Sequence, residues 1–243
     1  PINVTKSTTE EEIFNLFRKN ASNFSDVAKM FAHCYKLKLT RKNNQYANQV
    51  EKITDRQQMR NFYYVSSFSP ESKILSDNEI IQLWSKLPAE VKIYDCKLLY
   101  DNKSSPEADL MTLYDICNGY NEDNFVMFII QTENDEVFGG ITSRNFINNG
   151  KLDYIAPKQA VLFKARPEVG VYDYDKNQME VLLYEPGAIR FGYGDDGPAI
   201  SIGADLKEGW TEKKSVFGEV QLLKDPNADG SFKIKNMEVY LLV

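Results

Sequence analysis

The chain has 243 residues, a net charge of −6 and a pI near 5.1. A DNA- or RNA-binding protein gains much of its affinity by neutralising phosphates with basic residues, so this acidic balance predicts no nucleic-acid partner. The length suits one large domain, or a medium-sized domain with an extension. No apolar run approaches the ~20 residues that a membrane-spanning helix needs. We therefore expect no transmembrane segment and a cytoplasmic protein.

The cysteines and the single histidine limit the chemistry that the chain can perform. Cys34, Cys96 and Cys117 are widely spaced and contain no Cys-x-x-Cys pair, which indicates free thiols in a reducing compartment. With His33 as the only histidine, histidine-dependent nucleophilic triads and the usual zinc hydrolase sites are excluded. His33 and Cys34 are neighbours on an expected helix, and such neighbours do not face each other. The sequence predicts no cofactor and no metal.

Residues 1–70 are expected to form a helical N-terminal extension. Thr9 and Glu12 have the spacing of a capping box, and apolar residues follow at helical intervals. The polar stretch 40–60 fits either a surface helix or a loosely ordered linker. Pro70 follows a cluster of aromatic residues and marks the expected domain boundary.

Two further helices and a strand are expected after this boundary. Ser76 and Glu79 form a second capping box, and the helix that they begin ends at Pro88. Residues 97–100 read as a strand. Asp109 then caps a helix whose apolar residues recur at three- and four-residue steps.

From residue 124 onward the pattern becomes that of β-structure. The apolar run 125–130 predicts a strand buried on both faces, and residues 136–141 return antiparallel to it. Shorter strands are expected at 160–164, 179–184, 188–191, 198–203 and 232–243. Many short strands without βαβ alternation predict an α+β fold, in which a two-sheet antiparallel β-sandwich flanked by helices occupies residues 71–243.

The stretch 191–217 is the most distinctive in the chain because it is rich in glycine and acidic residues. We expect two loops that flank a buried strand. Exposed loops at one end of a rigid sandwich often carry recognition, and an acidic tip favours a basic partner surface. The predicted partner-binding residues are Gly194, Asp195, Asp196, Asp205, Lys207 and Glu208. The alternative is that Asp195, Asp196 and Asp205 chelate a metal or act as paired carboxylates.

Residues 225–231 begin like an EF-hand calcium loop, with oxygen-bearing side chains at loop positions 1, 3 and 5 and glycine at position 6. Position 12 is Asn236, which cannot supply a bidentate carboxylate. A hairpin turn is therefore expected, with weak calcium binding as the alternative.

Short motifs from residue 74 to the end follow one another in an order that resembles the TLDc domain family. They are Leu83-Trp84, Leu98-Leu99-Tyr100, Leu113-Tyr114, Val137-Phe138-Gly139-Gly140, Val161-Leu162-Phe163, Ala199-Ile200-Ser201-Ile202, Asp205 to Gly209, Phe217-Gly218 and Ile234 to Tyr240. The chain departs from the family pattern at Gln159, where the family has glutamate, and at 215–216, which lack its cysteine and threonine. Asp195 and Asp196 replace glycines of the family.

The resemblance implies a β-sandwich with helices at its edges, a role in resistance to oxidative stress and, for several members, binding to the vacuolar-type proton ATPase. It predicts a non-enzymatic regulatory module whose partners are peripheral subunits of that ATPase. Recruitment to vacuolar or lysosomal membranes would then occur through the partner. Two alternatives stay open: an enzyme or thiol-based antioxidant, and a calcium-responsive adaptor.

Overall fold

The computed structural model describes residues 68–69, 71–121, 124–143, 145–146, 154–179, 181–194, 196–225 and 229–243. The expected helices of residues 1–67, the His33–Cys34 pair and Asp195 lie outside the described residues. No helix within the described ranges is long and apolar enough to cross a membrane.

The chain divides into two compact units, and the second unit, Tyr63–Leu87 with Tyr94–Val243, holds all the described strands. A boundary at residue 70 stays a prediction. The helices of this unit are α4 (Asp77–Lys86) and α6 (Leu110–Asn118), whereas α5 (Ala89–Lys92) belongs to the first unit. The strands are β1 (Phe68–Ser69), β2 (Cys96–Asp101), β3 (Phe125–Thr132), β4 (Val137–Thr142), β5 (Ala160–Arg166), β6 (Gly170–Asp173), β7 (Leu182–Glu185), β8 (Ala188–Gly194), β9 (Gly197–Gly203), β10 (Glu208–Trp210), β11 (Lys214–Ser215), β12 (Gly218–Glu219) and β13 (Ser231–Leu242).

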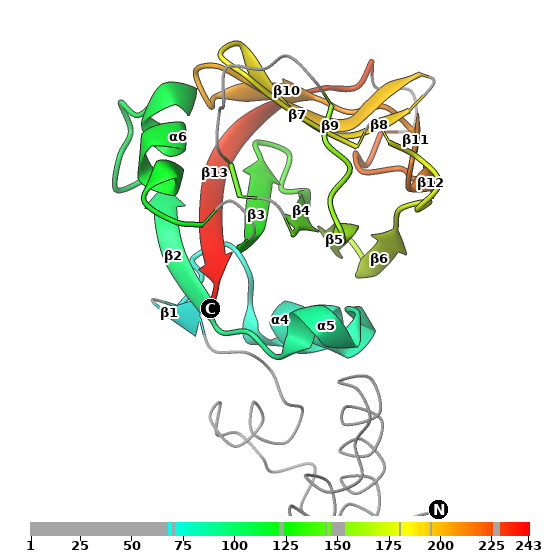
Figure 1. The fold of residues 1–243 in the computed structure, drawn as a ribbon, viewed down its shortest axis with the longest axis horizontal. Helices are drawn as coiled ribbons and strands as arrows, with labels where there is room; N and C mark the ends of the chain where they lie inside the picture. The colour runs from blue at the N-terminus through cyan, green and yellow to red at the C-terminus, as the bar shows by residue number, and fades with distance from the viewer. Residues whose placement is uncertain are drawn as a thin grey trace, which may run out of the picture. The chain divides into compact units, whose positions relative to one another are not determined.

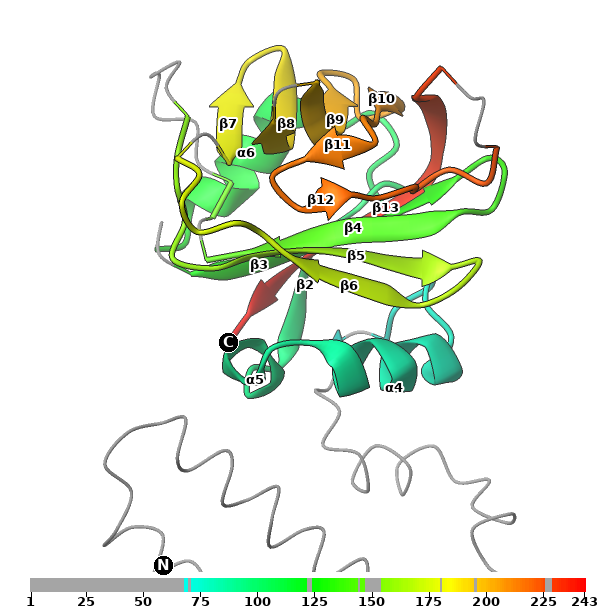
Figure 2. The ribbon, with the colours of Figure 1, turned by 90° about the vertical axis from the view of Figure 1, so that its right-hand side faces the viewer.

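The long strand β13 joins two sheets into a sandwich. Its first residues pair with β10, and its later residues lie between β3 and β2. Sheet A therefore has the order β6-β5-β4-β3-β13-β2, with β1 added to β2, and sheet B has the order β7-β8-β9-β10-β13. Figure 1 shows β13 curving from one layer into the other, and Figure 2 shows the two layers face to face. The expected α+β sandwich with flanking helices is confirmed.

The central strands β3 and β4 of sheet A are buried on both faces, as the apolar run of β3 predicts. Alternate residues of a strand point to opposite faces, and Phe128 packs inward against Phe191 of sheet B, with ring centroids 5.2 Å apart. Met127 and Ile129 point the other way and are also fully buried. On that outer face lies α4, which Figure 2 shows beneath β5 and β6.

Both predicted helix caps are present. The Ser76 hydroxyl accepts a hydrogen bond from the Glu79 backbone N–H, and the Glu79 carboxylate accepts one from the Ser76 backbone N–H, so α4 begins where its capping box indicates. Asp109 caps α6 by accepting from the Thr112 backbone N–H at 2.9 Å. The buried Tyr114 of α6 donates its hydroxyl hydrogen bond to a carbonyl at the end of β7, which ties the helix to sheet B.

The prediction for 191–217 is wrong in one respect: its second part is not a simple loop. Residues 208–210 form β10, which hydrogen-bonds to β9 on one side and β13 on the other. An alternation over three residues is too short to predict a strand by itself, and the pairing depends on neighbouring strands in space. The two-residue strands β1, β11 and β12 are also too short to predict from the sequence, and the four-residue β6 is a further strand missing from the sequence-based prediction.

Candidate functional site

Strand β9 separates the predicted partner-binding residues into two groups. Gly194 and Asp196 lie at the turn between β8 and β9, whereas Asp205, Lys207 and Glu208 follow the opposite end of β9. A seven-residue strand is about 20 Å long at 3.3 Å per residue. Asp196 and Asp205 therefore do not act as paired carboxylates or as ligands of one metal ion.

Gly194 has a packing role that explains its residue type. A Cβ built on Gly194 would lie 2.7 Å from the Cα of Ser215, because the backbone of β11 crosses there. The nearby Gly192 has φ +73° and would bring a Cβ within 2.3 Å of the Phe217 ring. The glycine-rich part of the family-like turn thus lets β11 pack against sheet B.

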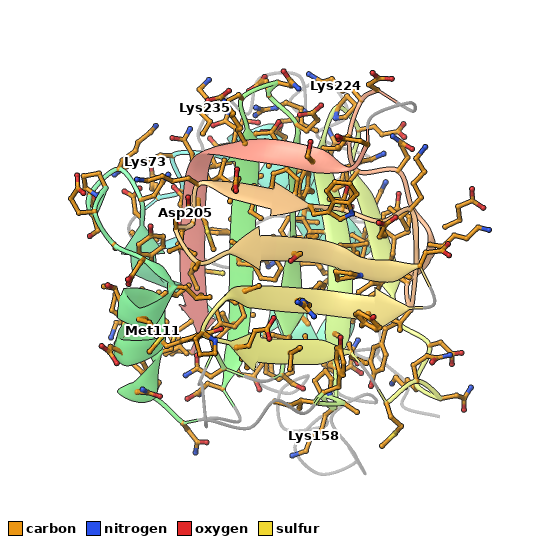
Figure 3. All side chains as sticks on the ribbon, turned by 90° about the horizontal axis from the view of Figure 1, so that it is seen from above. Lys73, Met111, Lys158, Asp205, Lys224 and Lys235 are labelled. Carbon is orange, nitrogen blue, oxygen red and sulfur yellow. The ribbon has the colours of Figure 1, made fainter. Side chains whose placement is uncertain are left out.

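The turn at Asp205 is fixed by its own chain. The Asp205 carboxylate accepts a hydrogen bond from the Lys207 backbone N–H at 2.9 Å, and Leu206, at φ +55°, buries its side chain below the turn. The Ala204 carbonyl accepts from the backbone of Leu110, the first residue of α6. Figure 3 shows Asp205 at the same end of sheet B as α6, whose exposed Met111 is labelled.

Glu208 lines a groove of about 580 Å³ on the outer face of sheet B, where β9, β10 and β13 meet the turn between β3 and β4. We call it the Trp210 groove. Its lining residues are Thr132, Glu133, Asn134, Ser201, Gly203, Glu208, Gly209, Trp210, Ser231, Phe232 and Lys233. Figure 3 views this face of the sheet. Of the five predicted residues that the structure describes, only Glu208 lines the groove.

Trp210 is the largest exposed side chain of the groove, with 39% of its surface accessible. Its indole N–H donates to the Glu212 carboxylate at 2.7 Å. The same edge of the indole lies beside Gly230, where an added Cβ would come within 3.0 Å of Cε2, the ring atom next to this nitrogen. The tryptophan is thus held in one orientation although its surface is partly open to solvent.

Three charged residues around the groove are not neutralised by their own chain. In the part of the chain that the structure describes, the side chains of Glu133, Glu208 and Lys233 form no ion pair or hydrogen bond. This holds even though Glu208 and Lys233 lie directly opposite each other on β10 and β13. A surface with an oriented tryptophan and free charges suits the binding of another molecule.

Sequence reasoning missed Trp210, Lys233 and Glu133. Glu208-x-Trp210 and Ser231-x-Lys233 do carry the two-residue alternation of strands whose outer face is exposed. That signal would have placed each pair on one face, but not the two pairs side by side.

The two described cysteines are poorly suited to thiol chemistry. Burial, reinforced by the nearby Asp95 carboxylate, raises the pKa of the Cys96 thiol far above its usual range. Burial also raises the pKa of Cys117 to about 12, against a smaller opposing effect of the Phe146 backbone. Because the thiolate is the reactive form, neither residue is activated toward oxidants. Cys34 lies outside the described residues.

In the described part of the predicted calcium-like turn, the polar side chains form hydrogen bonds within the protein. Asp229 accepts hydrogen bonds from both the backbone N–H and the hydroxyl of Ser231. Asn236 lies within β13, is buried, and donates its side-chain hydrogen bond to Gln131. Among the described residues, no group of three or more His, Cys, Asp or Glu side chains could hold a metal ion. The turn itself includes residues outside the described ranges, so calcium binding stays an open alternative.

A family model for the TLDc domain matches residues 68–243, which include both sheets, α4 and α6. The chain belongs to the TLDc family. The resemblance that the order of motifs indicates is therefore confirmed.

Curated proteins with similar sequences include the oxidation resistance proteins. Oxidation resistance protein 1 of Xenopus tropicalis is 23% identical over 209 residues, which are 85% of this chain and 22% of that protein. The protein of the same name from Homo sapiens is 23% identical over 208 residues, with the same shares. TBC1 domain family member 24 of Xenopus tropicalis is 26% identical over 160 residues, 63% of this chain and 27% of that protein. This chain thus spans between 22% and 27% of the length of these relatives.

Two positions at which the chain departs from the TLDc pattern have local structural roles. The backbone N–H of Gln159 donates to the Ser143 hydroxyl at 2.9 Å, and the Gln159 carbonyl accepts from the Ser143 backbone. The Ser215 hydroxyl accepts from the Phe217 backbone N–H at 3.2 Å. Both residues therefore fix a main-chain connection next to a strand.

Proposed function

We propose that this chain is a non-enzymatic protein-binding module that acts in resistance to oxidative stress by binding the vacuolar-type proton ATPase. The observation that carries the proposal is the TLDc match over residues 68–243. The similarity to oxidation resistance proteins supports the link to oxidative stress. The ATPase as partner comes from the family resemblance.

The proposed mechanism is docking onto the peripheral subunits of the ATPase, either in competition with another subunit or as a wedge between subunits. Docking of this kind favours disassembly or inhibition of the enzyme. The chain then works in the cytoplasm and reaches vacuolar or lysosomal membranes through its partner. Its outer surface supports this proposal, because the Trp210 groove combines an exposed aromatic side chain with free charges.

A pull-down with the purified peripheral sector of the ATPase tests the proposal. The full chain is immobilised, and an unrelated acidic protein of similar size serves as the matched control. We expect enrichment of the sector subunits on the full chain only, and a changed rate of ATP hydrolysis when the chain is added to the assembled enzyme. Equal recovery of the subunits on both proteins contradicts the proposal.

Replacing the cysteines distinguishes the proposed protein-binding function from that of a thiol-based antioxidant. If Cys34, Cys96 and Cys117 are all replaced by alanine, the proposed module should still protect cells against peroxide, provided that the variant folds. Loss of protection in a folded variant that still binds the ATPase sector favours the thiol alternative.

A further inference from the structure

The floor of the Trp210 groove is made of residues with little or no side chain. Ser201 and Gly203 of β9 and Ser231 of β13 lie on the outer face of the two strands that flank β10. Between them, Gly209 has no room for a side chain, since an added Cβ would lie 2.4 Å from the Phe232 ring and 2.5 Å from the Ser201 carbonyl oxygen. The groove is therefore shallow and open beside the indole of Trp210.

Trp210 is oriented before any ligand arrives. Its hydrogen bond to Glu212 and its packing over Gly230 fix the plane of the ring. An aromatic group that is already fixed loses little conformational entropy on binding. Tryptophan is also among the residues that most often dominate the energy of protein interfaces.

The charges around this ring are mainly negative. Glu133 and Glu208 line the groove with carboxylates that have no partner among the described residues, and Glu212 lies at the indole N–H. Lys233 is the only basic residue that lines the groove within the described residues. Two carboxylates and one ammonium group thus line the groove, with a third carboxylate at the indole N–H, and this negative balance favours a cationic ligand.

We propose that the Trp210 groove binds an arginine side chain of a partner protein. A guanidinium group is planar, stacks on an indole, and donates paired hydrogen bonds to a carboxylate such as that of Glu208. A neutral apolar side chain would instead remove water from Glu208 and offer it no hydrogen bond, which is unfavourable. The identity of the partner as the ATPase rests on the proposed function, whereas the chemistry of the bound side chain follows from the groove.

The first experiment titrates the full chain with a short peptide and follows its tryptophan indole N–H signals by NMR. The chain has two tryptophans, of which Trp84 is 1% exposed and Trp210 is 39% exposed, so the control signal lies in the same sample. The probe is the acetylated and amidated peptide Gly-Ser-Arg-Ser-Gly, and its matched control carries citrulline in place of arginine. Citrulline has nearly the same shape but no charge.

We expect the arginine peptide to shift the Trp210 signal saturably, to leave the Trp84 signal in place, and to bind about fivefold or more tightly than the citrulline peptide. Equal shifts with both peptides, or no shift of the Trp210 signal with either, overturn the proposal.

The second experiment measures binding of groove variants to the peripheral sector of the ATPase. Trp210→Ala and Glu208→Lys should each weaken binding about tenfold, because each removes a central part of the groove. The matched controls are Met111→Ala and Asp115→Lys on the exposed side of α6, and circular dichroism checks that every variant is folded.

The outcomes separate the two proposals. Folded groove variants that bind the sector as well as wild type overturn the arginine proposal and leave the proposed function in place. If the wild-type chain itself does not bind the sector, the proposed function fails, and the peptide titration decides the arginine proposal alone.

Discussion

The Glu238 and Asp101 carboxylates of sheet A are hydrogen-bonded within the protein, whereas the side chains of Glu133, Glu208 and Lys233 beside the Trp210 groove of sheet B form no hydrogen bond or ion pair among the described residues. On sheet A, the buried Glu238 carboxylate accepts hydrogen bonds from the Ser72 hydroxyl at 2.6 Å, the Lys73 backbone at 2.7 Å and the Tyr240 hydroxyl at 3.0 Å. These bonds hold the segment before α4 against the sheet. Glu208 and Lys233 on sheet B make no such bond.

This difference between the two faces indicates that their charged residues have different roles, in stability on sheet A and in recognition on sheet B. A buried carboxylate that is fully hydrogen-bonded fixes one conformation, and removing its partners is costly. Exposed charges without partners contribute little to folding. The same residue types therefore stabilise the fold on one face and remain available to a partner on the other, and variants on the two faces should behave differently.

The largest expected effect is at Glu238. Replacing Glu238 by alanine leaves the buried Tyr240 hydroxyl and the Ser72 hydroxyl without their acceptor. We expect the free energy of unfolding, measured by urea denaturation, to fall by about 3 kcal/mol. Lys235→Ala, on an exposed position of the same strand, is the control and should change it by less than about 0.5 kcal/mol. A similar, small change in both variants would remove the distinction between the faces.

The floor of the groove is the one part of the sheet B surface where we expect a large effect on stability. Gly209→Ala places a Cβ within 2.5 Å of the Ser201 carbonyl oxygen, so the backbone of β9 or β10 must shift. Overpacking of this kind should destabilise the fold by about 2 kcal/mol. Gly187→Ala, in the turn after β7, meets no atom within 4 Å and should change stability by less than about 0.5 kcal/mol. Thermal or urea denaturation of the two variants gives the comparison, and equal stability would contradict it.

The third expected effect is a pH-dependent contribution of Asp101, in strand β2 of sheet A, to the stability of the fold. Desolvation alone would raise the pKa of Asp101, but hydrogen bonds from Lys73, the Lys103 backbone and Ser104 outweigh it and hold the pKa below its usual value of 3.8. A carboxyl whose pKa is lower in the folded state stabilises the fold above its unfolded pKa, and this stabilisation is lost as the pH falls through the folded value.

We therefore expect Asp101→Asn to lower the free energy of unfolding by about 1 kcal/mol at pH 7. The difference from wild type should shrink as the pH falls below 3.8. Lys73→Gln removes the partner of Asp101 and should show the same loss of pH dependence. Denaturation curves at a series of pH values measure both, and a difference that stays constant down to pH ~2 would argue against this account.

The sequence predicts the helix caps and the buried strand β3 better than it predicts the Trp210 groove on the outer face of sheet B. Ser76 and Asp109 are readable as caps because each bonds to a residue three positions away, and the buried run of β3 is readable because it is continuous. The groove depends on the register between β10 and β13, which brings Glu208 opposite Lys233 from a distant part of the chain. No local pattern contains that pairing.

Closeness in sequence is also a poor guide to closeness in space at the predicted acidic tip. Asp196 and Asp205 are only nine positions apart, yet β9 lies between them and holds them at its opposite ends. The glycines of this stretch have a packing role, because Gly192 and Gly194 allow the close approach of Phe217 and Ser215.

The smallest expected effect is at the charges of the groove. Glu208→Gln and Lys233→Gln should each change the free energy of unfolding by less than about 0.5 kcal/mol, since neither side chain has a partner among the described residues. The double variant should equal the sum of the two single variants, because residues that do not interact show no coupling in a double-mutant cycle. Urea denaturation of the wild type, the two single variants and the double variant measures this coupling. A coupling above about 0.5 kcal/mol would reveal an ion pair between Glu208 and Lys233 in solution. Small, additive changes mean that these charges can be altered without unfolding the domain, so any loss of partner binding in the same variants reports on the groove itself.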